Sequence, residues 1–130
     1  MPEGGAGGRV PAVLGIDLGT SEAKVVLVGL DGTLLGSGRG GYPTATGPDG
    51  RAEQDPRAWW NAIAVATRAL DGAVRRADVM AIACVGQGPT LVAADAVGDP
   101  VRPAVTWQDR RPGGGGFGLL PRIAWLADAD

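Results

Sequence analysis

At the start of the chain, apolar residues fall into short runs that are separated by small and polar residues. The first run, Val10–Leu18, is almost continuously apolar, and this pattern predicts a β-strand with both faces covered. The second run, Lys24–Leu30, predicts another strand. It is followed by Asp31-Gly32, a two-residue signal typical of a tight hairpin, and by a third predicted strand, Thr33–Gly38. The pattern therefore predicts three strands in meander order before any helix.

A helix is predicted after Gly40–Arg51, a stretch rich in Gly, Pro, Thr and Asp that is typical of a loop. Asp55 can cap the helix and Pro56 suits its first turn. Arg75 and Arg76 fit the C-terminal end, where positive charge complements the helix dipole. The apolar stripe at helical spacing comprises Trp59, Trp60, Ile63, Ala66, Leu70 and Val74, and we expect at least one tryptophan to anchor the helix in the core.

A fourth apolar run, Val79–Val85, predicts a strand that ends at the loop Gly86–Pro89. Cys84 lies in this run, and we expect it to be a small buried hydrophobe rather than a nucleophile. The later predictions are strands at Thr90–Ala94 and Arg102–Trp107 with a turn at Gly98–Pro100, the polar loop Gln108–Arg111, a glycine break at Gly113–Gly116, and a helix at Leu119–Ala127 with Pro121 in its first turn.

Composition narrows the class of protein. The chain has 130 residues, which suits one domain with a core, and its 45% hydrophobic and 20% charged residues are typical of a globular protein. The net charge of −2 gives no basic surface for nucleic acid or an anionic membrane. One cysteine and no histidine argue against a disulfide framework and a zinc site. We expect a flexible leader at residues 1–9, one unit at residues 10–130, no membrane span, and a cytoplasmic location.

The most informative candidate chemistry lies in the run Gly15–Thr20, between the first two predicted strands. A tight turn of Gly, Thr and Ser presents backbone N–H groups and hydroxyls outward, and these groups suit the phosphates of a bound ligand. Asp17, at the end of the first strand, could then face a magnesium ion that bridges those phosphates. The alternative is an ordinary hairpin in which the aspartate only forms hydrogen bonds to the turn.

Two further loops follow apolar strands, and together with the first they suggest a divided site. Ligands of open α/β sheets usually bind at the carboxyl ends of the strands. The loops are Asp17–Ser21, Gly86–Pro89 and Trp107–Arg111. An indole beside amide, carboxylate and guanidinium groups suits a polyhydroxylated molecule, because the ring covers C–H faces while the polar groups bind hydroxyls. The pattern therefore predicts a phosphate corner beside a sugar-binding corner.

The motifs also carry a family resemblance. Gly15–Thr20 (GIDLGT), Glu53–Pro56 (EQDP) with Trp59-Trp60, Gly86-Gln87, and Trp107–Arg111 (WQDRR) occur in the order and spacing of the FGGY carbohydrate kinases, which include xylulokinases and glycerol kinases. The resemblance covers roughly residues 12 to 111 and returns at residues 120–126. It implies an α/β fold, part of a ribonuclease H-like (actin-like ATPase) domain, in an ATP-dependent kinase that phosphorylates a sugar or polyol hydroxyl.

The resemblance implies a role for individual residues. Asp17 would hold Mg²⁺, and Lys24 falls where glycerol kinases have a basic residue near the phosphates of ATP. Several of these residues also have an alternative, purely structural role. Lys24 can be merely solvated, and Gln87 can tie its loop to a backbone group. Arg110 and Arg111 can form weak surface pairs. The implied nucleotide contacts are Asp17, Gly19, Thr20, Ser21 and Lys24, and the implied substrate contacts are Gln87, Gly88, Pro89, Trp107 and Asp109.

The chain also departs from the family pattern. Gly88-Pro89 stands where xylulokinases have Met-His and glycerol kinases have Arg-Glu, so neither D-xylulose nor glycerol can be inferred from this loop. The catalytic base of the family is a later aspartate, beyond the end of this chain, as is the adenosine-binding domain. We therefore expect no catalytic residue and no turnover from this chain alone, and a second polypeptide that supplies the missing half is a candidate partner. The alternative is a non-catalytic remnant or binding module of the actin-like ATPase superfamily.

Overall fold

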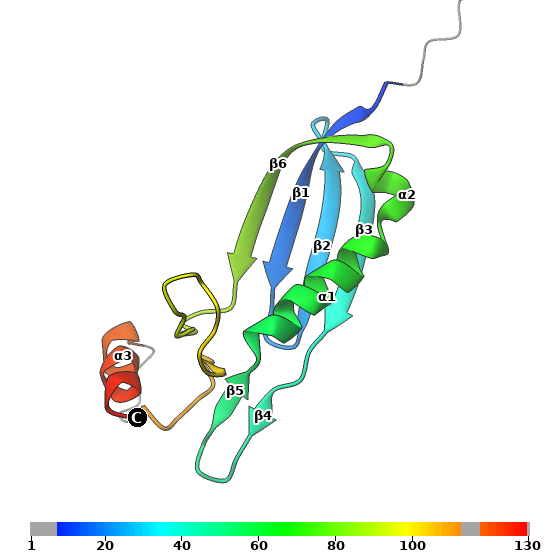
Figure 1. Ribbon diagram of the computed structural model, residues 1–130. Helices are drawn as coiled ribbons and strands as arrows, with labels where there is room; N and C mark the ends of the chain where they lie inside the picture. The colour runs from blue at the N-terminus through cyan, green and yellow to red at the C-terminus, as the bar shows by residue number, and fades with distance from the viewer. Residues whose placement is uncertain (1–7, 113–117, 130) are drawn as a thin grey trace, which may run out of the picture.

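The computed structural model describes residues 8–112 and 118–129, and its main feature is a four-stranded sheet in the order β3-β2-β1-β6. Figure 1 shows this sheet with helix α1 lying across it. Strands β1 and β2 are antiparallel, as are β2 and β3, whereas β6 runs parallel to β1. The strands comprise β1 (Val10–Leu18), β2 (Glu22–Gly29), β3 (Leu34–Gly41) and β6 (Ala77–Gly86).

The predicted meander is confirmed, and β1 has the predicted bounds. Strand β2 begins two residues before its predicted start, and β3 extends beyond its predicted end at Gly38. The turn between them contains Gly32 with a φ of 87°. A glycine is favoured there because side chains with a Cβ rarely adopt positive φ. The Asp31-Gly32 pair therefore predicts the position of the turn. The ends of the strands differ from the prediction because they depend on pairing with the neighbouring strand.

The single predicted helix is instead two helices, α1 (Pro56–Arg68) and α2 (Asp71–Val74). The start is as expected, since the Asp55 side chain accepts a hydrogen bond from the Arg57 N–H and Pro56 occupies the first turn. The break comes at Leu70, whose backbone leaves helical geometry with φ −95° and ψ 2°. Leu70 itself is buried in the core cluster, so the break coincides with a core contact.

Helix α1 covers the β2–β3 half of the sheet, and glycines allow the close approach. A Cβ on Gly38 would overlap the Ala66 carbonyl oxygen, and one on Gly40 would overlap the Ala62 carbonyl oxygen. These positions therefore need glycine for packing rather than for a turn. The core cluster beneath the helix contains Ala12, Leu14, Val25, Leu27, Ala66, Leu70 and Ala77.

Strand β6 is exposed along its length, from Asp78 to Gly86. The prediction that Cys84 is buried is therefore wrong: the thiol is free and exposed. The prediction that both faces of β1 are covered is only partly met, because Ala12 and Leu14 are buried under the helix side while Val13 on the other face is half-buried. Apolar character indicated strand structure in both segments, but only neighbouring elements can bury it.

A second, small sheet has the order β4-β5-β7, with β4 at Ala45–Thr46, β5 at Ala52–Gln54 and β7 at Ala104–Val105. Strand β4 corrects the expectation of a plain loop at Gly40–Arg51, and β5 begins directly after that stretch. The strands expected at Thr90–Ala94 and Arg102–Trp107 are also wrong in extent: Leu91 and Ala94 make only isolated bridges. Such short pairings leave no repeating pattern in the sequence.

The last element is helix α3 (Leu119–Asp128), which confirms the predicted helix and places Pro121 in its first turn. The expected glycine break at Gly113–Gly116 lies outside the described residues, as does most of the expected leader at residues 1–9. No helix within residues 8–112 or 118–129 is long and apolar enough to cross a membrane.

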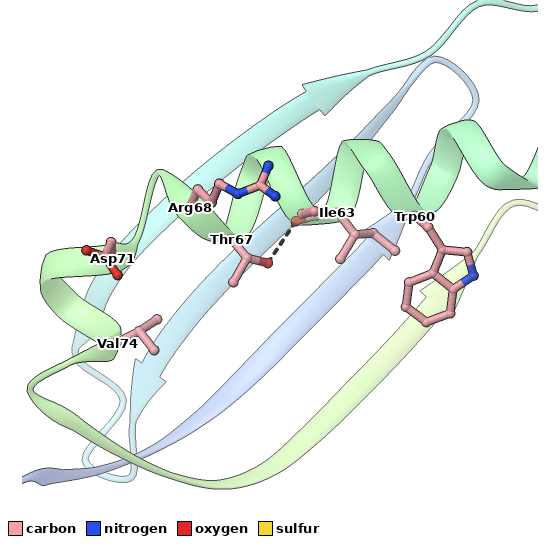
Figure 2. Close-up of a pocket in the computed structure, with 7 residues that line it drawn as sticks. Trp60, Ile63, Thr67, Arg68, Asp71 and Val74 are labelled. Carbon is pink, nitrogen blue, oxygen red and sulfur yellow. Dashed lines mark hydrogen bonds between the residues drawn. The ribbon is translucent and has the colours of Figure 1, made fainter.

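A hollow of about 410 Å³ runs along one side of α1 and reaches α2. Figure 2 shows Trp60, Ile63 and Thr67 projecting from the same side of the helix, with the Thr67 hydroxyl donating to the Ile63 carbonyl at 2.8 Å. The prediction that at least one tryptophan anchors the helix is confirmed by Trp59, which packs against the core, whereas Trp60 is 73% exposed.

Candidate functional site

The three predicted loops meet at one end of the main sheet. Because β1 and β6 are parallel, their carboxyl ends share an edge, and the Gln87 N–H donates to the Leu18 carbonyl at 2.8 Å. The Trp107 indole N–H approaches the Thr20 hydroxyl oxygen at 3.4 Å. The topology therefore brings together segments that are separated by most of the chain, as expected for an α/β sheet.

The turn between β1 and β2 holds its carbonyl groups toward the protein. The Gly19 carbonyl accepts from the Tyr42 hydroxyl at 2.6 Å, and the Thr20 carbonyl accepts from Gln54 Nε2 at 2.7 Å. The Ser21 carbonyl accepts from the Tyr42 N–H at 3.1 Å. Three consecutive carbonyl dipoles are thereby directed inward, so they do not oppose an anion on the other side of the turn.

The N–H groups of the same turn are divided between the fold and the site. The Gly19 N–H donates to the Glu22 carbonyl at 3.0 Å and closes the turn. The N–H groups of Thr20 and Ser21 make no hydrogen bond to any residue that the structure describes. Two adjacent free donors beside engaged carbonyls form a concavity suited to an anion. Of the predicted phosphate contacts, Thr20 and Ser21 therefore have available N–H groups and Gly19 does not.

Charged side chains flank the turn. Asp17 is exposed and pairs across the strands with Lys24, which places both on one face of the sheet. The Lys24 ammonium is exposed and lies 3.7 Å from a carboxylate oxygen of Glu22, whose other partner is Arg39 at 2.6 Å. Burial raises the pKa of the Tyr42 hydroxyl, and the negative charges of Asp17 and Glu22 raise it further. Tyr42 therefore stays protonated and keeps donating to Gly19.

Gln54 connects the turn to the other loops, and sequence reasoning did not single out its side chain. It is 2% exposed, and its Nε2 donates to the Thr20 carbonyl and to the Thr44 hydroxyl, both at 2.7 Å. Its Oε1 accepts from Trp59 Nε1 at 3.0 Å and from Gln87 Nε2 at 2.7 Å. A buried amide with four polar neighbours is fully satisfied. The available signal was a glutamine directly before the helix cap, inside the EQDP motif.

The Gln87 side chain does not bind a backbone group, so that alternative is wrong; it donates to Gln54 instead. Its Oε1 is shielded from solvent and has no hydrogen-bond partner among the described residues. The next two predicted substrate contacts, Gly88 and Pro89, are joined by a cis peptide bond, and Gly88 is exposed. Buried polar atoms are normally paired, so an orphaned acceptor in this loop calls for a donor.

Asp109, predicted as a substrate contact, is fully engaged within the protein. Its Oδ2 accepts from the Ala52 N–H at 2.9 Å and from Arg111 at 2.6 Å, and its Oδ1 accepts twice from Arg111 at 3.0 Å. Burial acts to raise the pKa of Asp109, but the hydrogen bonds from Arg111 and Ala52 outweigh it, and the pKa lies below its ordinary value of 3.8. No oxygen of this carboxylate is left to face a ligand.

Arg111 is the centre of a buried ion cluster rather than a weak surface pair. Besides Asp109, it contacts Glu53 at 2.6 Å, and its guanidinium lies 4.9 Å from the Trp125 ring centroid. The hydrogen bonds to Asp109 raise its pKa above the ordinary range, although burial opposes them. Arg110 differs, since its side chain is exposed and only its N–H bonds to the Gly50 carbonyl. The alternative of weak surface pairs therefore fails for Arg111.

Helix α3 holds the Trp107 loop from the other side. Arg122 is buried and donates to the Thr106 carbonyl at 2.9 Å and to the Trp107 carbonyl at 3.0 Å. Together with the contact between Arg111 and Trp125, these bonds fix the loop backbone. The Trp107 ring is half-buried beside Thr20, so the loop presents an indole next to the anion-binding turn.

The donor set limits what kind of metal could be held. No cluster of three or more His, Cys, Asp or Glu side chains occurs in the described part of the chain. Asp17 is a lone exposed carboxylate next to free N–H groups, which fits a Mg²⁺ ion that takes most of its oxygens from phosphates and water. The hollow along α1 is lined by other residues and is not part of this site.

The fold and the loops define an α/β domain whose candidate ligand site lies at the carboxyl ends of neighbouring parallel strands. The family model described as "FGGY family of carbohydrate kinases, N-terminal domain" matches residues 12–114. The chain therefore belongs to the FGGY family of carbohydrate kinases, and its α/β fold is that of their actin-like ATPase domain.

Known proteins similar to this chain agree with that family. The xylulose kinase of Streptomyces rubiginosus is 37% identical over 114 residues, which are 87% of this chain and 23% of that protein. The glycerol kinase of Janthinobacterium sp. is 34% identical over 102 residues, or 76% and 20% of the two chains. The crystal structure of a kinase from Brucella ovis, titled a xyloylose kinase, has a TM-score of 0.73 and 31% identity over 78% of this chain and 21% of that chain. This chain thus spans about a fifth of their length.

Proposed function

We propose that this chain forms the nucleotide-phosphate side and part of the substrate side of an ATP-dependent carbohydrate kinase. The observation that carries the proposal is the β1–β2 turn, where the protein engages the carbonyls of Gly19, Thr20 and Ser21. The N–H groups of Thr20 and Ser21 have no hydrogen-bond partner among the described residues. Membership of the FGGY family supports a kinase over a non-catalytic binding module. The phosphoryl group would pass from ATP to a sugar or polyol hydroxyl.

The residues of the turn would bind and orient phosphate. The N–H groups of Thr20 and Ser21 would donate to phosphate oxygens, and Lys24 would add a positive charge from the neighbouring strand. Asp17 would hold Mg²⁺, in part through water, and the ion would neutralise charge on the transferring phosphates. Gly19 would contribute space rather than a donor, because its N–H closes the turn.

The substrate side would comprise Gln87, Gly88, Pro89 and the Trp107 indole. The orphaned Gln87 Oε1 can accept from a hydroxyl, and the indole can cover the C–H face of a sugar. We assign Asp109 a positioning role, because its oxygens hold the Trp107 loop to β5 and to Arg111. The similar proteins act on different substrates by name, xylulose and glycerol, and Gly88-Pro89 matches neither loop pattern.

Nucleotide binding can be tested on the 130-residue chain. We expect ADP with Mg²⁺ to shift the amide NMR signals of Thr20 and Ser21, with a weak, millimolar-range affinity. Asp17→Asn should abolish the dependence on Mg²⁺, whereas Asp31→Asn, the same change in the exposed β2–β3 turn, should leave it intact. Shifts confined to other regions, or equal losses in both variants, would contradict the assignment of the turn.

Phosphoryl transfer needs a separate assay. The 130 residues alone should not consume ATP with D-xylulose, glycerol or D-gluconate, since they span only about a fifth of the length of the similar kinases. Addition of a polypeptide that carries those regions from a related xylulose kinase should restore turnover. Turnover by the isolated chain would contradict the proposal that it supplies only the phosphate side and part of the substrate side. Inactivity in every combination would count against a catalytic role.

A further inference from the structure

The orientation of the Gln54 amide is set by the chemistry of its neighbours. The Trp59 indole N–H can only donate, and the Thr20 carbonyl can only accept. Gln54 Oε1 must therefore face Trp59, and Nε2 must face Thr20. With the reverse orientation, two donors would meet at Trp59 and two acceptors would meet at Thr20, and neither of these part-buried pairs would form a hydrogen bond.

This orientation is passed on to Gln87. Because Gln54 presents Oε1, the Gln87 side chain must offer its Nε2, which donates at 2.7 Å. The other polar atom of the Gln87 amide, Oε1, is then left unused, and it has no hydrogen-bond partner among the described residues. Thr90 Oγ1, three residues further along the same loop, is also buried and unpaired in the described structure. The Gln87 amide oxygen can only accept and therefore indicates a place for a hydrogen-bond donor, whereas the Thr90 hydroxyl can pair with a donor or an acceptor.

We propose that Gln54 is a positioning residue that holds the Gln87 amide with Oε1 as an acceptor for a substrate hydroxyl. The inference rests on the proposed function for the identity of the ligand. Gln54 itself would not touch substrate, since its four polar contacts are all within the protein. The arrangement selects a ligand group that donates, such as a hydroxyl, over an ether or carbonyl oxygen at the same position. It also joins the phosphate turn and the substrate loop through one side chain.

The first test is spectroscopic and needs no ligand. Side-chain NH₂ signals of Gln54 and Gln87 in the ¹⁵N-labelled chain should exchange with water about tenfold more slowly than those of the exposed Gln108. Trp59→Phe removes one of the two groups that orient Gln54, while the Thr20 carbonyl remains, so Gln87 exchange should accelerate toward that of Gln108. The matched control is Trp60→Phe, the neighbouring and 73% exposed tryptophan, which should change nothing.

Two results would overturn the inference. One is Gln87 exchange in the unmodified chain as fast as that of Gln108, and the other is the same effect from Trp59→Phe and Trp60→Phe. Trp59 packs edge-on against Tyr42 with ring centroids 6.5 Å apart, so its replacement could also disturb the fold. Gln54→Met keeps the side-chain length and removes the amide, and it should free Gln87 in the same way.

The second test uses glycerol and D-xylulose as donor probes and 1,2,3-trimethoxypropane as a probe without donors. Glycerol or D-xylulose should shift the Gln87 side-chain signals, and the ether should not. Trp59→Phe should weaken that binding about three- to tenfold relative to Trp60→Phe, as expected for one neutral hydrogen bond. Equal binding by the two variants, or binding of the ether, would overturn the positioning role. Slow Gln87 exchange without binding of any probe would support the positioning role and contradict the proposed substrate class.

Discussion

Strands β2 and β6 show how little apolar character alone says about burial. β2 carries Glu22 and Lys24, yet Val25 and Leu27 in it are completely buried. β6 has no charged residue after Asp78, yet all of its residues from Asp78 onward are exposed, including Ile82 at 65%. The more apolar strand is therefore the more exposed one.

The difference lies in their neighbours. β2 has a strand on each side and α1 on one face, whereas β6 has β1 on one side and little of the described chain over its faces. A continuous apolar run is typical of a strand buried on both faces. β6 thus has the sequence of a covered strand without its cover in the described residues. Three sets of variants test this difference in burial, and a fourth experiment tests the small sheet.

The largest effect should come from truncation of the same kind of side chain in each strand. Leu27→Ala should lower the free energy of unfolding by about 2–5 kcal/mol, because it leaves a cavity under α1. Ile82→Ala should change it by no more than about 0.5 kcal/mol, since the side chain is already exposed. Urea unfolding followed by circular dichroism measures both. Similar losses would show that β6 is buried in solution and would break the comparison.

A methyl group added under α1 should have the next largest effect. Gly38→Ala places a Cβ against the Ala66 carbonyl oxygen, and overpacking of this kind costs about 1–3 kcal/mol. Gly41→Ala, on the same strand, meets nothing nearer than 3.8 Å and is the control. The midpoint of thermal unfolding should fall clearly for the first variant alone. An unchanged midpoint for Gly38→Ala would mean that helix and sheet are not in close contact.

The exposed edge of β6 should promote self-association. Long apolar edge strands offer free backbone groups to other chains, and an inserted lysine is a common protection. Ile82→Lys should weaken association about tenfold, which corresponds to roughly 1.4 kcal/mol. Val97→Lys introduces the same charge at an 84% exposed loop position and should have little effect. Sedimentation velocity over a concentration series would measure the self-association. A monomer at all concentrations would contradict the prediction that the β6 edge pairs with other chains.

The smallest effect should be a pH-dependent loosening of the small sheet. The pKa of Asp109 is lower in the folded state than its ordinary 3.8, so the unfolded state binds more protons near that pH. The stabilisation is therefore complete above pH 3.8 and is lost as the pH falls through the lower folded value. Amide exchange of Ala52 and Arg111, which donate to Asp109, should accelerate there before that of Leu27. Asp109→Asn should remove this step, and simultaneous loss at all three amides would contradict a local effect.

Local patterns predicted the regular elements well. The β1–β2–β3 meander, the Asp55 cap and helix α3 were all predictable, because each depends on residues close together in the chain. The break at Leu70, the short strands β4 and β5 and the exposure of Cys84 were not, and β7 is shorter than the strand predicted at Arg102–Trp107. Two- and three-residue strands have no period, and a bend or an exposed strand depends on what packs against it.

The candidate site divides in the same way. The residue types of the turn at Asp17–Ser21 and the loops that meet it were visible in the sequence, and their meeting follows from parallel strands. The residues that form hydrogen bonds to the turn could not be identified from the sequence. Tyr42 and Gln54 reach the turn across 23 and 34 residues of chain, and no local pattern reports such contacts. The charge of Asp109 is evident from the sequence, but its hydrogen bonds with Arg111 and the Ala52 N–H are evident only in the folded structure.

The order of strands, turns and helices can be predicted from the residues alone, because propensity, capping and turn chemistry are local properties, and the family motifs are visible there as well. The tertiary structure decided which groups of the turn remain free, and how the side chain of Gln54 orients that of Gln87. It also decided that the apolar strand β6 is exposed while Val25 and Leu27 of β2, a strand that carries charges, are buried. Hydrogen-bond satisfaction and burial are sums over neighbours distant in the chain, and only the folded arrangement supplies those neighbours.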